Sequence, residues 1–252
     1  DLCFADYVFF CNSGTEAIEA SIKIARRYFF NTQKSKTKNE IITFKNSFHG
    51  RTLATLAAAS NSIHTEGFNP IPDGFVNIPL DENILKKTIS DKTAGILIEP
   101  VQGEGGINPV SNEFLVFIRK LCDENKILMI LDQVQCGMGR TGKLFSHEWS
   151  GIEPDIVTLA KGLGAGFPIG AVLASEEASK GMQQGSHGST FGGNPVGCSI
   201  ALKVIELIEK EEILNNVTRL SGILICELEK LVEKHHNKIS GVRGKGLIIG
   251  VE

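Results

Sequence analysis

The stretch IVTLAKGLGAGFPIGAVLA, residues 156–174, places one lysine at the end of an apolar run. The run over residues 156–160 has the composition of a buried strand, and Lys161 follows it directly. Three glycines come within the next five positions, at Gly162, Gly164 and Gly166. Glycine has no Cβ, so such positions let the backbone approach another group closely. We therefore expect a buried strand that ends on an amine in sterically open surroundings.

Apolar runs alternate with segments of helical periodicity along the rest of the chain, which is typical of β-α-β units. The predicted strands cover residues 41–44, 75–78, 95–99, 127–132, 155–159 and 169–174. The predicted helices cover residues 16–30, 82–89, 112–125, 195–208 and 211–233. This pattern predicts an α/β fold with a mainly parallel central sheet flanked by helices.

Three regions follow from this pattern. Residues 1–210 form a large domain, residues 211–239 a connecting helix, and residues 240–252 the first strand of a small C-terminal α/β domain. The sequence starts at Asp1 without a methionine and stops on an apolar strand-like run, GLIIGVE. We therefore expect a piece of a longer protein that has further segments at both ends.

Composition excludes several classes of protein. The net charge is −3, which gives no electrostatic basis for binding nucleic acid or a membrane surface. No apolar run reaches the length of a membrane span, so a cytoplasmic protein is expected. The six cysteines stand singly, which favours reduced thiols over disulfides or a metal site. The pair His235-His236 lies in a polar run and is interpreted as a solvated helix end.

The segment NSGTEAIEASIKIARRYF, residues 12–29, enters a helix at Gly14, Thr15 and Glu16. The free backbone N–H groups and the dipole at such a start attract an anion such as phosphate. Ordinary capping by the hydroxyl of Ser13 or Thr15 explains the same residues, so both readings stay open.

Two residues end neighbouring predicted strands. Asp132 ends ILMILD, and Lys161 ends DIVTLAK. Parallel strands open on one edge, where ligands bind, although a structural ion pair would be the simpler reading of these two residues alone. Together with an anion-binding helix start, they suit a ligand with a phosphate, a cationic ring nitrogen and an aldehyde. Pyridoxal phosphate has all three groups.

Two glycine patterns imitate nucleotide sites. Gly137, Gly142 and Lys143 have the spacing of a P-loop, but Leu144 stands where a Mg²⁺-binding hydroxyl is required. GLGAGF lacks the third glycine of a dinucleotide fingerprint. Neither pattern supports nucleotide binding.

Six motifs in order resemble the class III (ornithine-type) aminotransferases, which depend on pyridoxal phosphate and have fold type I. They are NSGTEAIEA, FHGRTLATLAA, IEPVQGEGGI, LDQVQCGMGRTG, PDIVTLAKGLGAGFPIGA and GSTFGGNP. The second and the last two look most similar to the N-acetylornithine branch, with ornithine and 4-aminobutyrate as the alternative donors. The resemblance implies amine transfer to 2-oxoglutarate in arginine biosynthesis.

The resemblance also implies roles at the cofactor. Lys161 would bind the aldehyde covalently and move the substrate proton, and Asp132 would pair with the ring nitrogen. Ser13, Gly14 and Thr15 would hold the phosphate. Phe48 would stack on the ring, although a plain core position is the alternative, and Gln135 would contact the phenolic oxygen.

Substrate and subunit contacts are implied in the same way. Arg51 would bind the substrate carboxylate, with Ser189 near the substrate. Glu104 would be the glutamate that pairs, in relatives, with a C-terminal arginine to switch between substrates. Thr190 would reach the partner subunit's phosphate in a homodimer with shared active sites. Three nearby residues are interpreted as structural: His49, Glu99 and Arg140.

The sequence departs from the family at two points. Gln133 stands where relatives usually have Glu, and the segments that relatives carry at both ends are missing. A non-catalytic remnant that keeps the fold without the cofactor is therefore the competing hypothesis.

Overall fold

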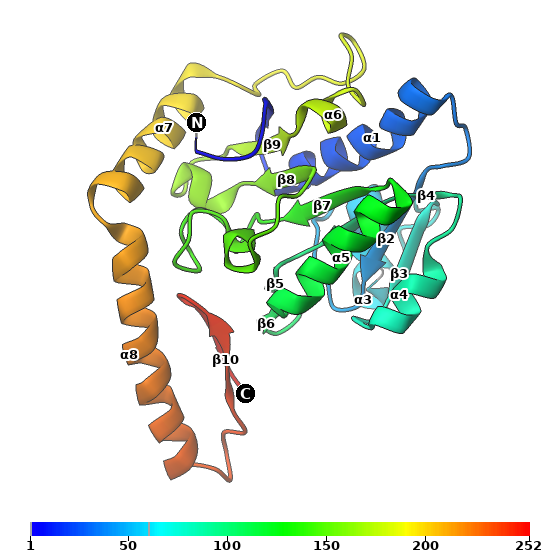
Figure 1. The fold of residues 1–252 in the computed structure, drawn as a ribbon. Coiled ribbons are helices and arrows are strands. Elements are labelled where there is room, and N and C mark those ends of the chain that lie inside the picture. Colours follow the sequence, from blue (N-terminus) through cyan, green and yellow to red (C-terminus); the bar gives the residue numbers. More distant parts are fainter. Residues whose placement is uncertain (1, 60) are drawn as a thin grey trace.

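The computed structural model describes residues 2–59 and 61–252; Asp1, where the predicted large domain begins, lies outside them. Its centre is a seven-stranded sheet in the order β1-β9-β8-β7-β4-β2-β3 (Figure 1). The strands are Tyr7–Cys11 (β1), Glu40–Phe44 (β2), Phe75–Ile78 (β3), Thr93–Ile98 (β4), Leu128–Asp132 (β7), Ile156–Leu159 (β8) and Gly170–Ala174 (β9).

The middle of the sheet is parallel, as predicted, and its two outermost pairings on one side are not. β7 pairs in parallel with β4 and with β8, and Asp132 lies opposite Thr158. β9 runs antiparallel to β8, and β1 runs antiparallel to β9. The reversal at β9 occurs because a short turn, residues 160–169, connects it to β8, whereas a parallel return needs a crossover of a dozen or more residues.

Two layers of helices enclose the sheet. Gly14–Gln33 (α1) covers one face, and Asn112–Asn125 (α5) covers the other (Figure 1). Successive strand residues point to opposite faces, so Leu97 packs with the α1 layer while Ile96 and Ile98 pack with the α5 layer. Both faces are therefore apolar cores, and polar side chains gather at the strand ends.

The C-terminal part extends away from the sheet. Pro195–Lys210 (α7) is followed by Ile213–Lys234 (α8), which runs beside β10 (Figure 1). The last segment corrects a sequence prediction, because it forms an antiparallel hairpin and not a single strand. The hairpin consists of Val242–Lys245 (β10) and Ile248–Val251 (β11), joined by a turn at Gly246 with φ of 62°.

The sequence analysis missed β1 and seven short elements. The short elements are Leu53–Ala59 (α2), Ser62–Thr65 (α3), Val101–Gln102 (β5), Asn108–Pro109 (β6), Ser146–Ser150 (η1), Lys161–Gly164 (η2) and Glu176–Ser179 (α6). Glu82–Thr88 (α4) lies where a helix was predicted. Within residues 2–59 and 61–252, no helix combines the length and apolarity needed to cross a bilayer.

Candidate active site

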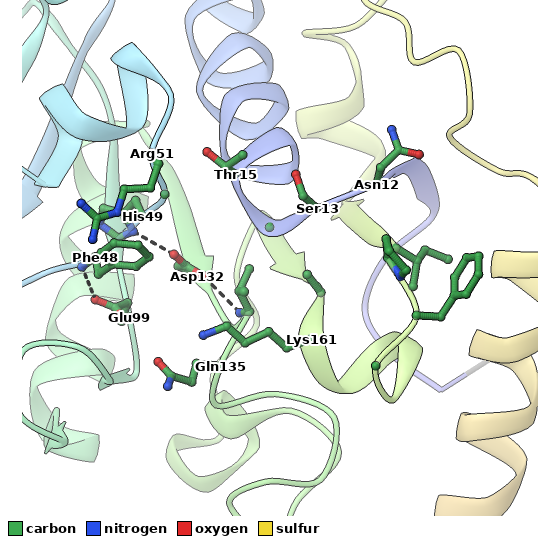
Figure 2. A pocket seen from close by; sticks show the side chains of 18 residues that line it. Asn12, Ser13, Thr15, Phe48, His49, Arg51, Glu99, Asp132, Gln135 and Lys161 are labelled. Atoms are coloured by element: carbon green, nitrogen blue, oxygen red, sulfur yellow. Dashed lines mark hydrogen bonds and ion pairs between the residues drawn. The ribbon is translucent and has the colours of Figure 1, made fainter. Parts of the chain in front are cut away.

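A cavity of about 420 Å³ lies at the carboxyl ends of β7 and β8 (Figure 2). The start of α1, the loop at residues 48–51 and the turn after β8 complete its wall. It brings together eight of the residues that the sequence analysis singled out: Ser13, Gly14, Thr15, Phe48, Arg51, Asp132, Gln135 and Lys161. These residues come from four separate segments of the chain.

Asp132 is the buried acid of this cavity. Its side chain is paired with His49, whose Nδ1 lies 2.8 Å from Asp132 Oδ2, and not with Lys161 as an ion pair of the two strand ends would require. Asp132 Oδ1 also accepts hydrogen bonds from Val134 N at 3.1 Å and from the hydroxyl of Thr158 at 3.4 Å. These donors fix the carboxylate in one orientation with little freedom to rotate.

His49 and Glu99 form the buried surroundings of that acid. Burial alone would lower the pKa of His49, but the hydrogen bond and the charge of Asp132 raise it above its usual value. Burial raises the pKa of Glu99 to about 7, although the charge of His49 acts against it. Glu99 accepts hydrogen bonds from Phe48 N at 2.9 Å and from Gly103 N at 3.3 Å, so it connects the loop at Phe48, which borders the cavity, to the turn after β5.

Lys161 begins η2 immediately after β8 and Ala160. Its φ of 40° lies in the left-handed region, which costs a non-glycine residue of order 1 kcal/mol and is concentrated at functional sites. Figure 2 shows its side chain reaching into the cavity beside Asp132 and Gln135. The lysine is also more exposed than the residues around it.

The glycines after Lys161 correct the expectation of uniformly open surroundings. A Cβ at Gly162 would lie 3.0 Å from Met138 Cβ, and one at Gly164 would lie 2.7 Å from Ile169 Cγ2. Only Gly166, with φ of 111°, borders the cavity with open space around it. Two of the three glycines therefore allow the turn to pack against protein, and one keeps the cavity clear.

The start of α1 forms the opposite wall. Ser13 is the N-cap, and its hydroxyl accepts a hydrogen bond from Glu16 N at 3.3 Å, so the capping reading is correct for this residue. The first N–H groups of a helix have no partner within it, and they carry the positive end of the dipole. A Cβ at Gly14 would lie 2.7 Å from Val134 Cγ1, so this position has room only for glycine.

Phe48 and Arg51 border the cavity from the loop before α2. The Arg51 guanidinium carbon lies 5.2 Å from the centre of the Phe48 ring, within the range of a cation–π contact. Phe48 is half-buried, which excludes the alternative that it is a plain core residue. Arg51 is exposed and free to meet an anion entering the cavity.

Three of the predicted residues lie elsewhere. Ser189 and Thr190 border a separate hollow beside Asn12, where Ser189 Oγ accepts hydrogen bonds from Asn12 Nδ2 at 3.2 Å and Gly192 N at 3.0 Å. Glu104 is exposed in the turn between β5 and β6 and does not border the cavity. Arg140, interpreted as a loop residue, lies in the turns after β7; they lead into η1 and not into the α-helix of a P-loop.

Three residues of the cavity wall were not predicted as site residues from the sequence. Asn12 borders both hollows, and its backbone and side-chain N–H groups donate to Glu16 Oε2 at 2.6 and 3.0 Å. His49 and Glu99 were interpreted as structural, yet both line the cavity. Both lie within motifs of the family, His49 in FHGR and Glu99 in IEPV, and this position could have indicated a place at the site.

Gln133, the departure from the family pattern, is buried behind the cavity. Its Oε1 accepts a hydrogen bond from Ser146 N at 2.6 Å, and its Nε2 lies 2.7 Å from His147 Nδ1. The amide has an acceptor oxygen and a donor NH2 group, and each of these two atoms has a partner. Gln133 thus anchors η1 to the end of β7 without a charge.

The comparisons with known proteins agree with this geometry. The model of the family "Aminotransferase class-III" matches residues 1–252. The chain belongs to this family. Its sequence is 49% identical to an acetylornithine aminotransferase of Rhodobacter capsulatus, over 98% of this chain and 63% of that protein. The chain thus spans less than two thirds of the length of this relative.

Solved structures confirm fold type I. An ornithine aminotransferase from Toxoplasma gondii, whose crystal has pyridoxal phosphate at partial occupancy, matches with a TM-score of 0.95 and 32% identity over 98% of this chain and 60% of that one. N-acetylornithine aminotransferase from Stenotrophomonas maltophilia K279a matches with a TM-score of 0.79 and 38% identity over 97% and 58%. Both the fold class and the resemblance predicted from the sequence are therefore correct.

Class III aminotransferases depend on pyridoxal phosphate, and the cavity residues fit that cofactor. The volume lies in the range of small-molecule sites. The N-terminus of α1 borders the cavity at Ser13, Gly14 and Thr15, and such a helix start suits a phosphate group. A buried carboxylate and an amine stand at adjacent strand ends, as a ring nitrogen and an aldehyde require. Each of the three groups of the cofactor thus has a chemically suitable partner at the cavity.

His147 provides a test of the packing behind the cavity. Burial lowers its pKa from 6.5 to about 4, so the folded protein holds this ring neutral. Because the unfolded chain binds this proton more readily than the folded protein does, the free energy of unfolding is unaffected by His147 above about pH 6.5 and decreases as the pH falls toward 4. We expect His147→Asn, which keeps an acceptor for Gln133, to remove about 2 to 4 kcal/mol of that acid destabilisation.

The measurement is urea unfolding at several pH values between 4 and 7. His236→Asn is the matched control, because His236 is exposed at the end of α8 and has no buried partner to lose. An acid destabilisation equally large in wild type and in His147→Asn would show that this ring does not carry the effect.

Proposed function

We propose that the protein is a pyridoxal-phosphate-dependent aminotransferase. It would move the terminal amine of N-acetylornithine, or of a related omega-amino donor, to 2-oxoglutarate, giving glutamate and a semialdehyde in arginine biosynthesis. One observation carries the proposal: Lys161 and the buried Asp132 end adjacent strands and face the N-terminus of α1 across one cavity. The 49% identity to an acetylornithine aminotransferase supports the choice of donor.

Each cavity residue has a part in this proposal. When bound, the cofactor supplies an aldehyde for the amine and a ring that accepts the electron pair of a cleaved C–H bond. Asp132 keeps the ring nitrogen protonated, and its own orientation is held by His49. Lys161 would take the proton from the substrate carbon as general base and then deliver it, as general acid, to the cofactor carbon that carries the aldehyde.

The remaining residues bind and orient. Ser13, Gly14 and Thr15 hold the phosphate at the start of α1, and Gln135 contacts the phenolic oxygen. Phe48 packs on the ring face. Arg51, exposed at the rim, binds a substrate carboxylate through its two-pronged guanidinium. Glu104 and Ser189 lie outside this cavity, so they would contact the substrate only where further segments of the protein or a partner subunit complete the site.

The donor is tested by turnover. We expect the full-length protein with 2-oxoglutarate to form glutamate from N-acetylornithine with a higher kcat/KM than from ornithine or 4-aminobutyrate. The binding of the acetylated tail favours the preferred donor by more than tenfold, a difference of about 1.4 kcal/mol in transition-state binding. Glutamate formed only from 4-aminobutyrate would contradict the proposed donor, and no glutamate from any amine would favour the non-catalytic alternative.

Lys161 is tested separately from the choice of donor. We expect Lys161→Ala to lower kcat by more than about a thousandfold, since both the covalent anchor and the proton carrier are lost. In the wild type, borohydride should fix the cofactor covalently to the protein. In the variant, the cofactor should remain removable by dialysis after the same treatment. Lys203→Ala, an exposed change on α7, is the control. Covalent fixation that persists in Lys161→Ala would exclude the assignment.

We further propose a two-fold homodimer with shared active sites in the cytoplasm, where the six single cysteines stay reduced. Ser189 and Thr190 lie outside the cavity that holds Lys161, and Thr190 is exposed. A hydroxyl pair on an exposed glycine-rich loop suits a phosphate bound by the partner subunit. An isologous dimer would then contain two such sites.

Subunit exchange between two impaired variants tests this arrangement. In a mixed dimer, Lys161→Ala and Thr190→Ala fall in the same site, and the other site is intact. We expect an equal mixture to recover roughly one quarter of the wild-type activity, since half of the dimers carry one intact site each. No recovery, when exchange is demonstrated by differently tagged subunits, would mean that each site is built within one chain.

A further inference from the structure

A second cavity, of about 520 Å³, lies toward the far end of α1 from the candidate active site. Lys23 and Arg27 border it and lie about 12 and 18 Å further along the helix axis than Thr15. The two cavities share no lining residue. Five of its lining residues are cations: Lys23, Arg26, Arg27, Lys36 and Lys38. This basic cavity therefore has a chemistry different from that of the first.

Within the described part of the chain, no acid forms an ion pair with these cations. The lining contains no Asp or Glu, and none of the five cations takes part in an ion pair within 4.0 Å. Glu19 acts on Arg26 only through its charge, and its carboxylate accepts a hydrogen bond from Thr52 at 2.6 Å. Five like charges around one hollow repel one another unless an anion lies between them.

Three of the cations contact other parts of the protein, and Lys23 Nζ lies 2.8 Å from His187 Nδ1. Arg26 donates to the backbone oxygens of Asn39 at 3.0 Å and Asp73 at 2.9 Å, and Lys38 Nζ lies 4.3 Å from the centre of the Phe29 ring. Burial lowers the pKa of both side chains, so each cation has lost part of its hydration. A bound anion would restore the lost stabilisation.

Arg27 supplies the unpaired donor. Its Nε is fully buried and, among the described residues, has no hydrogen-bond partner. A buried N–H without an acceptor is rare in folded proteins and destabilises the fold that contains it. The guanidinium presents its donors in a planar fork that matches phosphate oxygens.

We propose that the basic cavity binds a small anion that carries several phosphate groups. A single carboxylate or phosphate would neutralise one or two of the five cations and leave most of about 520 Å³ unfilled. Two or three linked phosphates carry enough negative charge to meet Arg27 and also Lys36 and Lys38, the lysines of the following loop, which line the same cavity. Phe30 and Met182 give the cavity an apolar edge that tolerates an organic group on the phosphate chain.

The probe is sodium tripolyphosphate, titrated by calorimetry into the full-length protein at saturating pyridoxal phosphate, so that the N-terminus of α1 is already filled. We expect one site per chain, with an affinity that falls as the salt concentration rises. Arg27→Gln should weaken binding at least tenfold, and Arg27→Lys should weaken it less because the charge remains but the fork is lost. ATP should bind at the same site with similar or higher affinity.

Lys87→Gln is the matched control, because it removes the same charge from an exposed position on α4 outside the cavity. Equal unfolding temperatures of the unliganded proteins would show that the variants are folded. No binding up to about 1 mM tripolyphosphate would overturn the proposal. So would equal weakening by Arg27→Gln and Lys87→Gln, or binding only to a long polyanion such as heparin, because either result would mean general surface attraction. Calorimetry reads binding alone, so failure here leaves the proposed aminotransferase activity untouched.

Discussion

The parallel pairing of β7 with β8 is the constraint on which the candidate site depends. The register places Asp132 opposite Thr158, three residues before Lys161, so the acid and the amine reach the same edge of the sheet. Both strands are buried on their two faces, by the α1 layer and by the α5 layer. A slip by one residue would turn each apolar side chain to the wrong face, which makes this register costly to change.

The same edge concentrates charges that the core would not tolerate singly. Asp132, His49 and Glu99 are all nearly inaccessible to water, and burying an unpaired charge is expensive. The charges of Asp132 and Glu99 both stabilise the protonated ring of His49, and the hydrogen bond to Asp132 adds to this effect. These interactions explain why the pKa of His49 is raised in spite of burial. Because the pKa of Glu99 is raised to about 7, this carboxyl group is protonated in part of the molecules near neutral pH. The site is therefore a coupled set of three groups and not one isolated acid.

Periodicity and strand-end residues were enough to predict the parallel centre of the sheet and the meeting of Asp132 with Lys161. The antiparallel edge was not predictable in this way, because the direction of β9 depends on the short turn after Lys161 and β1 was not predicted as a strand. The partner of Asp132 was also missed. His49 is 83 residues away from Asp132 in sequence. Only the packed structure shows that Asp132 pairs with His49 and not with Lys161.

The turn after Lys161 shows how backbone geometry and chemistry are joined at this edge. The left-handed φ of Lys161 bends the chain at the end of β8, and η2 continues the reversal. Gly162 and Gly164 let that turn pack against Met138 and Ile169 without a side chain between them. The strain at Lys161 persists because these contacts on both sides of the turn over-determine its path. The backbone thereby holds the base of a long side chain with several rotatable bonds, and the proposed transfer of a proton between two atoms would use the movement that these bonds allow the amine.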